Sequence, residues 1–407
     1  MTSITIIGAG QSGLQLAIGL LDNGYDVTVV SDRTPEAIAN GRVTSSQCMF
    51  GSALAREAAL GLDMWSQTAP PVQGIGFTVP GPDGNPAFSW SARLDLPAQS
   101  VDQRVKMPAF MREFANRGGN LVFASADVAA LETYCASSDL VIVAAGKGEI
   151  AGLFPRDEVR STLTAPARAL SLTYVTGMTP REPYSAVSFS MVPGVGEYFV
   201  FPALTTTGPC EIMVMEGIPG GPMDCWAGLT PDEHLAKAKW VVDTFTPWES
   251  DRCRDLELTD GQGVLAGRFT PTIRRPVATL PSGAPVLGMA DVVVLNDPIT
   301  GQGSNNASKC AASYLASILE VGDGPFDATF MQNTFEKYWD YAKYVVTWTN
   351  ALLSPPPPHV LALLGGGAVD ERIARRFANG FDDPRDFFNW FMDPADAASE
   401  YLEPAAS

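Results

Sequence analysis

The chain has little histidine, and this scarcity limits the chemistry that its side chains can perform. Its 407 residues include only His234 and His359, too few for a multi-histidine metal centre and a poor basis for a histidine triad. His234 lies in a helix-like segment and is expected to face solvent. The six cysteines form no C-x-x-C pair, so neither a zinc site nor a disulfide framework is indicated. The chemistry of this chain must therefore come largely from a cofactor.

Long apolar runs and an excess of positive charge are also missing. No uninterrupted hydrophobic run approaches the ~20 residues that a bilayer span needs, and the N-terminal residues lack the pattern of a secretory signal. We therefore expect a cytoplasmic protein. The formal net charge of −18 would repel a phosphate backbone, which argues against a nucleic-acid partner.

The order of apolar segments predicts an α/β fold. The first 31 residues read as a strand, a glycine-rich turn, an amphipathic helix and a second strand, which is the order of a parallel sheet. From about residue 165 to 257, short alternating runs separated by proline and glycine predict a second, mostly antiparallel sheet. The residues after Phe326 read as helical, with a break at the four prolines 355–358.

A glycine-rich motif follows the first strand. Gly8-Ala9-Gly10-Gln11-Ser12-Gly13 has the spacing and the context of a dinucleotide fingerprint. Its first glycine permits the tight turn, its second lets a pyrophosphate approach the backbone, and its third brings helix and strand close together. The second strand ends at Ser31-Asp32, where an acidic ribose partner is expected; Asp32 either fills that role or is a solvated loop charge.

Two segments near residue 300 resemble the flavoprotein aromatic hydroxylase superfamily. Gly288-Met289-Ala290-Asp291 ends a late strand, and a proline- and glycine-rich loop, Asp297 to Asn306, opens a helix. The resemblance implies FAD as cofactor, with Asp291 at the ribityl chain or a phosphate and the loop against the isoalloxazine ring. The positive end of the helix would stabilise negative charge on a reduced flavin. Arg42 stands where these proteins place a pyrophosphate-contacting arginine, although it could be a surface residue. The expected cofactor-binding residues are Gly8, Gly10, Ser12, Gly13, Ser31, Asp32, Arg42, Asp291, Pro298, Gly301, Gly303 and Asn305.

A closer resemblance covers most of the chain. The segments that carry it look like the oxygenase component of two-component styrene and indole monooxygenases: Ser31–Pro35, Arg56-Glu57, Trp65, Asp102-x-Arg104, Asp139–Lys147, Asp297–Gly303 and Thr347–Asn350. The resemblance implies that a separate NADH-dependent flavin reductase supplies reduced FAD. It also implies that oxygen is transferred from a flavin C4a-hydroperoxide, with no catalytic side chain beyond the flavin. A homodimer is compatible with this interpretation.

Six positions resemble the indole branch of that family. Ser45, Gln47 and Met49 alternate after Arg42 as Ser, Gln and Met do in indole-type members, and Val72, Ile75 and Ala98 match further small-residue positions. If residues 45–49 are extended, the first three side chains share one face, and a polar Gln or Ser could accept a hydrogen bond from an indole N–H. Alternatively, these six residues are ordinary sheet residues beneath a loop.

These observations lead to one hypothesis and several alternatives. We expect an FAD-dependent epoxidase that acts on the C2=C3 bond of indole and leads to indoxyl and indigo. The alternatives are a styrene monooxygenase that gives styrene oxide, a one-component NAD(P)H-dependent aromatic hydroxylase, and a non-catalytic flavin-binding protein.

The predicted fold is a Rossmann-type FAD-binding domain of the glutathione-reductase-like, aromatic-hydroxylase type, with an inserted antiparallel substrate domain and a helical C-terminal segment. The FAD-binding domain is expected in three parts, 1–72, 99–164 and 271–325. The substrate domain is expected to contain strands from 73–98 and the sheet of 165–270, and the helical segment covers 326–407.

Overall fold

A six-stranded sheet forms the nucleotide-binding half of the molecule. The computed structural model describes residues 2–145, 149–397 and 400–401. The sheet has the order β15-β16-β7-β1-β2-β6, and all its neighbouring strands are parallel except β15 with β16. Its members are β1 (Ser3–Ile7), β2 (Asp26–Ser31), β6 (Asn120–Phe123), β7 (Leu140–Val143), β15 (Val277–Thr279) and β16 (Pro285–Gly288). The predicted Rossmann-type core is confirmed.

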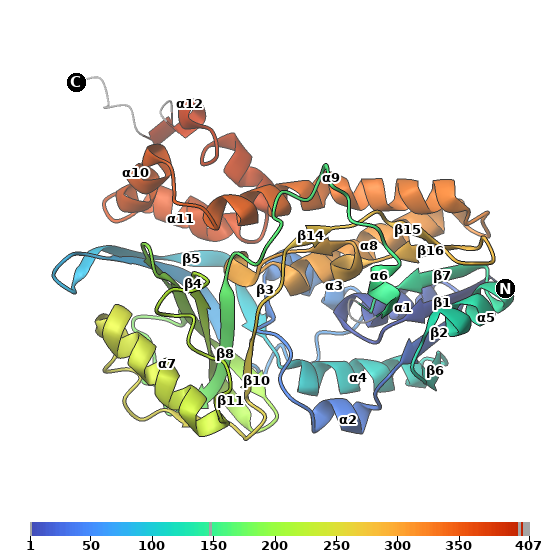
Figure 1. Cartoon of the computed structure of the whole chain (residues 1–407), viewed down its shortest axis with the longest axis horizontal. Helices are drawn as coiled ribbons and strands as arrows, with labels where there is room; N and C mark the ends of the chain where they lie inside the picture. The colour runs from blue at the N-terminus through green and yellow to red at the C-terminus, as the bar shows by residue number, and fades with distance from the viewer. Residues whose placement is uncertain (1, 146–148, 398–399, 402–407) are drawn as a thin grey trace.

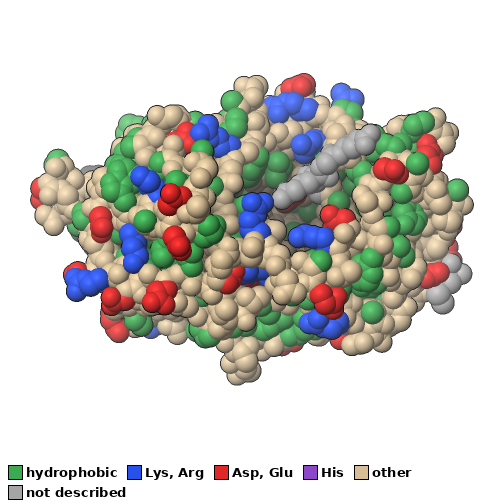
Figure 2. All heavy atoms as spheres, turned by 60° about the horizontal axis from the view of Figure 1, so that its bottom comes forward, with side chains coloured by type: hydrophobic (Ala, Val, Ile, Leu, Met, Phe, Trp, Pro, Cys, Tyr) green, Lys and Arg blue, Asp and Glu red, His purple; other side chains and the backbone are tan. Residues whose placement is uncertain are grey.

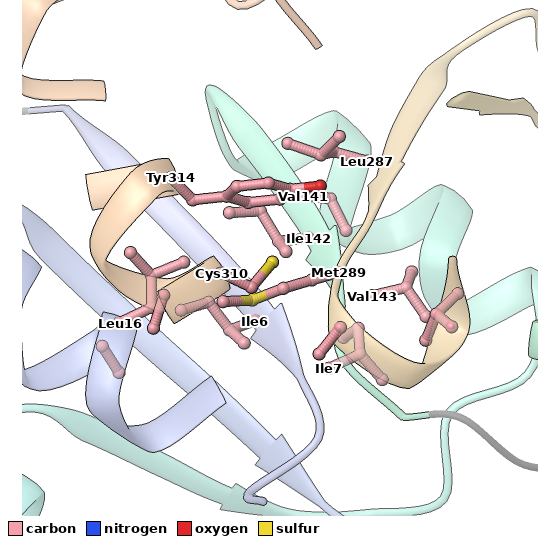
Figure 3. Packing of buried hydrophobic residues seen from close by; sticks show 14 of the residues in the cluster. Ile6, Ile7, Leu16, Val141, Ile142, Val143, Leu287, Met289, Cys310 and Tyr314 are labelled. Atoms are coloured by element: carbon pink, nitrogen blue, oxygen red, sulfur yellow. The ribbon is translucent and has the colours of Figure 1, made fainter. Parts of the chain in front are cut away.

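Helices cover this sheet because its central strands are apolar on both faces. The helices of this half are α1 (Gln11–Asp22), α2 (Pro35–Ala39), α3 (Gly51–Ala58), α4 (Gln103–Asn116), α5 (Val128–Ser137), α6 (Glu149–Gly152) and α8 (Gly303–Val321). In the core beneath α8, Cys310 and Tyr314 lie against Ile142 and Met289 (Figure 3). Each of these four side chains is fully buried. This packing holds α8 against β7 and the segment that follows β16.

The second sheet joins strands from two distant parts of the chain. Its order is β12-β8-β11-β10-β9-β4-β5-β3, with β13 also paired to β8. β4 lies parallel to β9, so the early hairpin of β4 and β5 continues the sheet that the middle of the chain forms. The strands are β3 (Cys48–Met49), β4 (Pro71–Pro80), β5 (Pro86–Ser100), β8 (Ala169–Thr176), β9 (Ala186–Val192), β10 (Gly196–Thr205), β11 (Gly208–Gly217), β12 (Glu257–Leu258) and β13 (Val264–Gly267).

Two helical layers sandwich this second sheet. α7 (Pro231–Phe245) covers its outer face, drawn in yellow in Figure 1. His234 of α7 was expected to face solvent, and that expectation is wrong: its side chain is 3% exposed, and its Nε2 lies 2.8 Å from Ser171 Oγ. A helix that packs on a sheet buries one stripe of its surface, and His234 lies on that stripe.

The C-terminal helices cover the other face of the second sheet, drawn in red in Figure 1. The long helix α9 (Ala328–Leu352) ends before the four prolines, and α10 (Pro358–Gly366), α11 (Glu371–Gly380), η4 (Pro384–Asn389) and α12 (Pro394–Ala397) follow. The predicted break at the prolines is therefore confirmed. The remaining short elements are η1 (Pro247–Glu249), β14 (Thr272–Ile273), η2 (Ala290–Val292), β17 (Val294–Leu295) and η3 (Pro298–Thr300).

The fold class that the sequence predicted is the one observed, including the inserted sheet and the helical C-terminal segment. The division into domains at the predicted residue boundaries stays a prediction, although residues 73–98 and 165–270 do contribute strands to one common sheet. None of the helices in the described residues is both long and apolar enough to span a bilayer.

Candidate functional site: an FAD groove beside an apolar cavity

The glycine turn after β1 has the geometry of a pyrophosphate site. Gly8 has φ of +120° and donates its N–H to Val30 O at 2.8 Å. A Cβ at Gly13 would overlap the Gly8 carbonyl, whereas one at Gly10 would meet no atom within 4 Å. Ser12 is buried in the first turn of α1. Gly13 is thus required by packing, while Gly10 leaves open space at the positive N-terminus of α1, where an anion is stabilised.

Polar residues lie at the end of β2, next to this turn. Ser31 is buried, and its Oγ donates to Arg33 O at 2.8 Å. Asp32 is exposed, and its Oδ1 lies 3.7 Å from Arg33 Nε. The role of Asp32 as ribose partner stays a prediction. Arg42 is exposed and forms no ion pair with the residues that the structure describes. Figure 2 shows a face that is hollowed near its centre, with Lys and Arg side chains and some Asp and Glu side chains around the hollow.

The loop before α8 has a second open glycine turn. Asp297 caps η3 by accepting the Ile299 N–H at 3.1 Å, and Pro298 is the first residue of η3. Gly301 then takes a left-handed conformation with φ of +63°, and a Cβ at Gly301 or Gly303 would meet no atom within 4 Å. Because α8 begins at Gly303, the free N–H groups of its first turn lie beside this open space.

Asn305 holds this loop in place. Its Oδ1 accepts the Phe50 N–H at 2.8 Å, and its Nδ2 donates to Cys48 O at 2.9 Å and to Gly301 O at 3.0 Å. The side chain is fully buried. All three hydrogen bonds go to backbone groups, so the Asn305 side chain positions the loop. Its role in binding the cofactor stays a prediction.

The helix α3 connects the two glycine segments. Phe50 at its N-terminus is held by Asn305 of α8, and Glu57 in its last turn accepts a hydrogen bond from Gln11 of α1 at 2.7 Å. At 1.5 Å per residue, these two contacts are separated by roughly 10 Å. The pyrophosphate and the isoalloxazine ring of FAD are separated by a ribityl chain, so the described residues fit this cofactor.

Two non-glycine residues with positive φ lie in the predicted motifs. Ala290 has φ of 51° and precedes Asp291, which is exposed. Gln47 has φ of 23°. Left-handed backbone costs free energy at a residue with a Cβ, and such residues cluster at functional sites. The positions of Ala290 and Gln47 fit that pattern.

The Asp102-x-Arg104 motif ties the two halves together. Asp102 caps α4 by accepting the Arg104 N–H, and Arg104 donates to both oxygens of Asp260 at 3.0 Å and to Thr205 of β10. Arg104 is 4% exposed. This motif therefore fixes the second sheet against the nucleotide half. Of the Asp139–Lys147 motif, residues 146 and 147 lie outside the described residues.

An apolar cavity lies next to the loop before α8. Its empty space, including the part open to solvent, is about 510 Å³. The second sheet, the loop and the C-terminal helices all contribute to its walls. The lining residues are Ile75, Phe77, Phe189, Met191, Glu197, Ile299, Leu352, Ser354, Pro356, Leu364, Phe377 and Phe381. Ile299 belongs to η3, so the cavity borders the segment that the resemblance places against the flavin.

One of the six predicted pocket residues, Ile75, lines this cavity. Val72 and Ala98 form a buried cross-strand pair of β4 and β5 in the same apolar cluster. Ser45 is half-buried, and Gln47 and Met49 are buried. The sequence did not indicate the aromatic residues of α11 or Glu197 as lining residues. The sequence feature that could have indicated the aromatic lining residues is the run rich in Phe and Trp from 377 to 391.

Residues 45–49 are not extended throughout, so the condition under which Ser45, Gln47 and Met49 would share one face is not met. Only Cys48 and Met49 are in a strand, because Gln47 is left-handed and closes a ring of hydrogen bonds. Ser45 Oγ donates to Gln47 Oε1 at 2.6 Å, Gln47 Nε2 donates to the Tyr174 hydroxyl at 2.8 Å, and that hydroxyl donates to Ser45 O at 2.8 Å. Met49 Sδ lies 2.9 Å from Lys106 Nζ. The side chains therefore do not share one face through strand alternation.

Comparisons with known proteins identify the class of enzyme. A family profile described as "Styrene monooxygenase A putative substrate binding domain" matches residues 146–252. The styrene monooxygenase StyA of Pseudomonas fluorescens is 28% identical over 396 residues, which cover 94% of this chain and 93% of that protein. A second StyA, from Pseudomonas sp, has the same identity and coverage. The chain is a flavin-dependent monooxygenase related to styrene monooxygenase. Its cofactor is FAD.

Solved structures agree with this monooxygenase fold. The flavin-dependent brominase Bmp2 has a TM-score of 0.63 at 16% identity and covers 98% of this chain and 99% of its own. A flavoprotein/dehydrogenase from Cytophaga hutchinsonii has a TM-score of 0.66 at 12% identity, with 94% and 93% covered. At these identities the likeness supports the fold of the monooxygenase and leaves its substrate to the residues of its own cavity.

Proposed function

We propose that this monooxygenase is the oxygenase component of a two-component system that epoxidises a small aromatic alkene. A separate NADH-dependent flavin reductase supplies reduced FAD, and one atom of O₂ is transferred to the substrate. The observation that carries the proposal is the apolar cavity that Ile299 borders, directly beside the FAD loop. Gly365 and Gly366 end α10 rather than following a strand, so this glycine run does not have the context of an NAD(P)H fingerprint. The proposal places the enzyme in the cytoplasm, where NADH is regenerated.

In this proposal the chain positions the substrate next to FAD and excludes water from the site. Bound reduced FAD supplies the activated oxygen, and the protein supplies the site around it. The open N-terminal turn of α8 favours negative charge next to the loop. Apolar walls hold an aromatic ring and exclude water.

A styrene-like vinyl arene, which would give styrene oxide, is the first candidate substrate. The two curated relatives are styrene monooxygenases, and an apolar cavity needs no hydrogen-bonding group on its ligand.

Indole is the second candidate substrate, and its product would lead to indoxyl and indigo. The Ser45, Gln47 and Met49 pattern favours it, as does Glu197 on the cavity wall. Each oxygen of Glu197 accepts one hydrogen bond from Arg168, which leaves lone pairs for an indole N–H.

The test is a competition between the two substrates. The purified chain, a generic flavin reductase, NADH and FAD are supplied with equal styrene and indole, and the epoxide and indigo are quantified. We expect products only when the reductase is present. NADH consumption by the chain alone would instead indicate a one-component hydroxylase, and absence of any product with either substrate would support a non-catalytic flavin-binding protein.

A further inference from the structure

Three acidic side chains and one arginine are buried together where the second sheet meets the FAD loop. Glu197 of β10 and Glu216 of β11 lie directly opposite one another in register. Asp297 at the start of the loop faces them, and Arg168 precedes β8. Their exposed fractions are 5% for Glu197, 0% for Glu216, 2% for Asp297 and 7% for Arg168. Like charges directly opposite on neighbouring strands are destabilising, so this arrangement needs compensation.

Arg168 compensates one of the three acids. Its Nε donates to Glu197 Oε2 at 2.7 Å and its Nη2 donates to Glu197 Oε1 at 2.8 Å, which is the bidentate geometry of a strong ion pair. Its Nη1 donates to the carbonyl oxygens of Ala167 and Leu353. The charge of the arginine is therefore matched by Glu197, and two acids remain.

Glu216 has no N–H or O–H donor for either carboxylate oxygen among the described residues. The group that it contacts is the carboxyl of Asp297. Asp297 accepts the Ile299 N–H, which favours its charged form. Two carboxylates in contact in a dry site cannot both be ionised. Burial, followed by the charges of Asp297 and Glu197, holds the pKa of Glu216 well above its usual range.

We propose that Glu216 keeps its proton at neutral pH and donates it in a hydrogen bond to Asp297, and that this carboxyl pair positions the Pro298–Gly303 loop. The proton lies between one Glu216 oxygen and one Asp297 oxygen. Arg168, Glu197 and Asp297 are the charged groups that act on Glu216. With the proton the four groups carry one net negative charge, and without it they carry two. Deprotonation thus pushes Asp297, and with it Ile299, away from β11. The proton itself is a property of the chain alone, and only the effect on FAD rests on the proposed function.

The first experiment detects the proton by infrared spectroscopy of the chain without FAD. A protonated, buried carboxyl has a carbonyl stretch separate from that of carboxylates. Glu211→Gln is the matched control, because Glu211 lies on the same strand away from the loop and burial raises its pKa to about 7. At about pH 8.5, where Glu211 is ionised, the band should persist in wild type and Glu211→Gln and disappear in Glu216→Gln. An unchanged band in Glu216→Gln, or no band in wild type, would overturn the proposal.

The second experiment measures binding of oxidised FAD by equilibrium dialysis as a function of pH. Glu216→Leu removes the donor and leaves Asp297 with an uncompensated buried charge, so FAD affinity should fall by about tenfold or more. Glu216→Gln should restore affinity, because its amide donates to Asp297 without a titrating proton. Its affinity should also lose the decline that wild type shows at high pH. Wild-type affinity in Glu216→Leu, or a Glu216→Gln variant as weak as Glu216→Leu, would contradict the positioning role. Because infrared needs no FAD, failure of the proton claim is distinguishable from failure of the proposed function.

Discussion

At the scale of single residues, Gly10 and Gly13 of the fingerprint have different tasks. A side chain at Gly10 would enter open space, whereas one at Gly13 would collide with the Gly8 carbonyl. Gly10→Val should therefore weaken FAD binding by about tenfold or more with little change in the free energy of unfolding, because it fills the space for the pyrophosphate. Gly13→Val should instead cost about 1–3 kcal/mol of stability through overpacking. Equilibrium dialysis with FAD and urea unfolding measure the two effects, and the reverse assignment would contradict the account.

The residues at 47 and 49 are predicted to influence substrate preference. Gln47→Val combined with Met49→His should raise turnover of styrene relative to indole. The double variant replaces two residues that resemble the indole branch, and it removes the Gln47 amide, which could accept a hydrogen bond from an indole N–H. Tyr174→Phe is the control, since it also opens the hydrogen-bonded ring but keeps Gln47. Competition assays give the ratio for each protein. An unchanged ratio in the double variant would remove these positions from substrate selection.

His234 makes stability depend on pH in the acid range. Burial lowers the pKa of His234 to about 4, below its ordinary value of about 6.5. The unfolded chain therefore binds the proton more readily, so stability is fully present above about pH 6.5 and is lost as the pH falls toward 4. The loss attributable to this residue is up to about 3 kcal/mol. Urea unfolding at several pH values should show a steeper acid decline in wild type than in His234→Gln, and parallel curves would contradict this role.

At the scale of elements, the loop before α8 depends on Asn305. Its side-chain amide forms hydrogen bonds with the backbone of Phe50, Cys48 and Gly301. Asn305→Ala would leave the Phe50 N–H and the Cys48 carbonyl buried without that partner. The expected loss is about 2–4 kcal/mol in the free energy of unfolding, together with weaker FAD binding. Asn305→Asp keeps the acceptor for the Phe50 N–H and should be less damaging to stability. Equal losses in the two variants would show that the loop does not depend on this contact.

The sequence predicted elements whose signal is local and missed those set by distant contacts. Near-continuous apolar runs identified β1, β2 and β7, and the glycine and proline positions identified both turns. The sequence left open whether residues 45–49 are extended. In the structure Gln47 is left-handed, and its side chain bonds to Tyr174, which is far away in sequence. Alternation alone cannot show such a contact.

At the scale of the whole molecule, the cavity has walls that meet only after the chain folds. Ile75 comes from the first hairpin, Glu197 from the middle of the second sheet, and Phe377 from the C-terminal helices. A single sequence carries no signal that these residues are neighbours, so the FAD motifs were predictable and most of the cavity was not. The resemblance to known oxygenases indicated the cofactor, and our proposal assigns the aromatic substrate to the apolar cavity that borders the loop before α8.

The most direct measurement is a single turnover without any reductase or NADH. The chain is mixed anaerobically with chemically reduced FAD and styrene, then exposed to ¹⁸O₂, and the products are analysed by mass spectrometry. We predict styrene oxide that carries one ¹⁸O atom, in an amount that follows the FAD bound. Recovery of unchanged styrene with hydrogen peroxide alone, or of epoxide whose oxygen comes from water, would contradict the account.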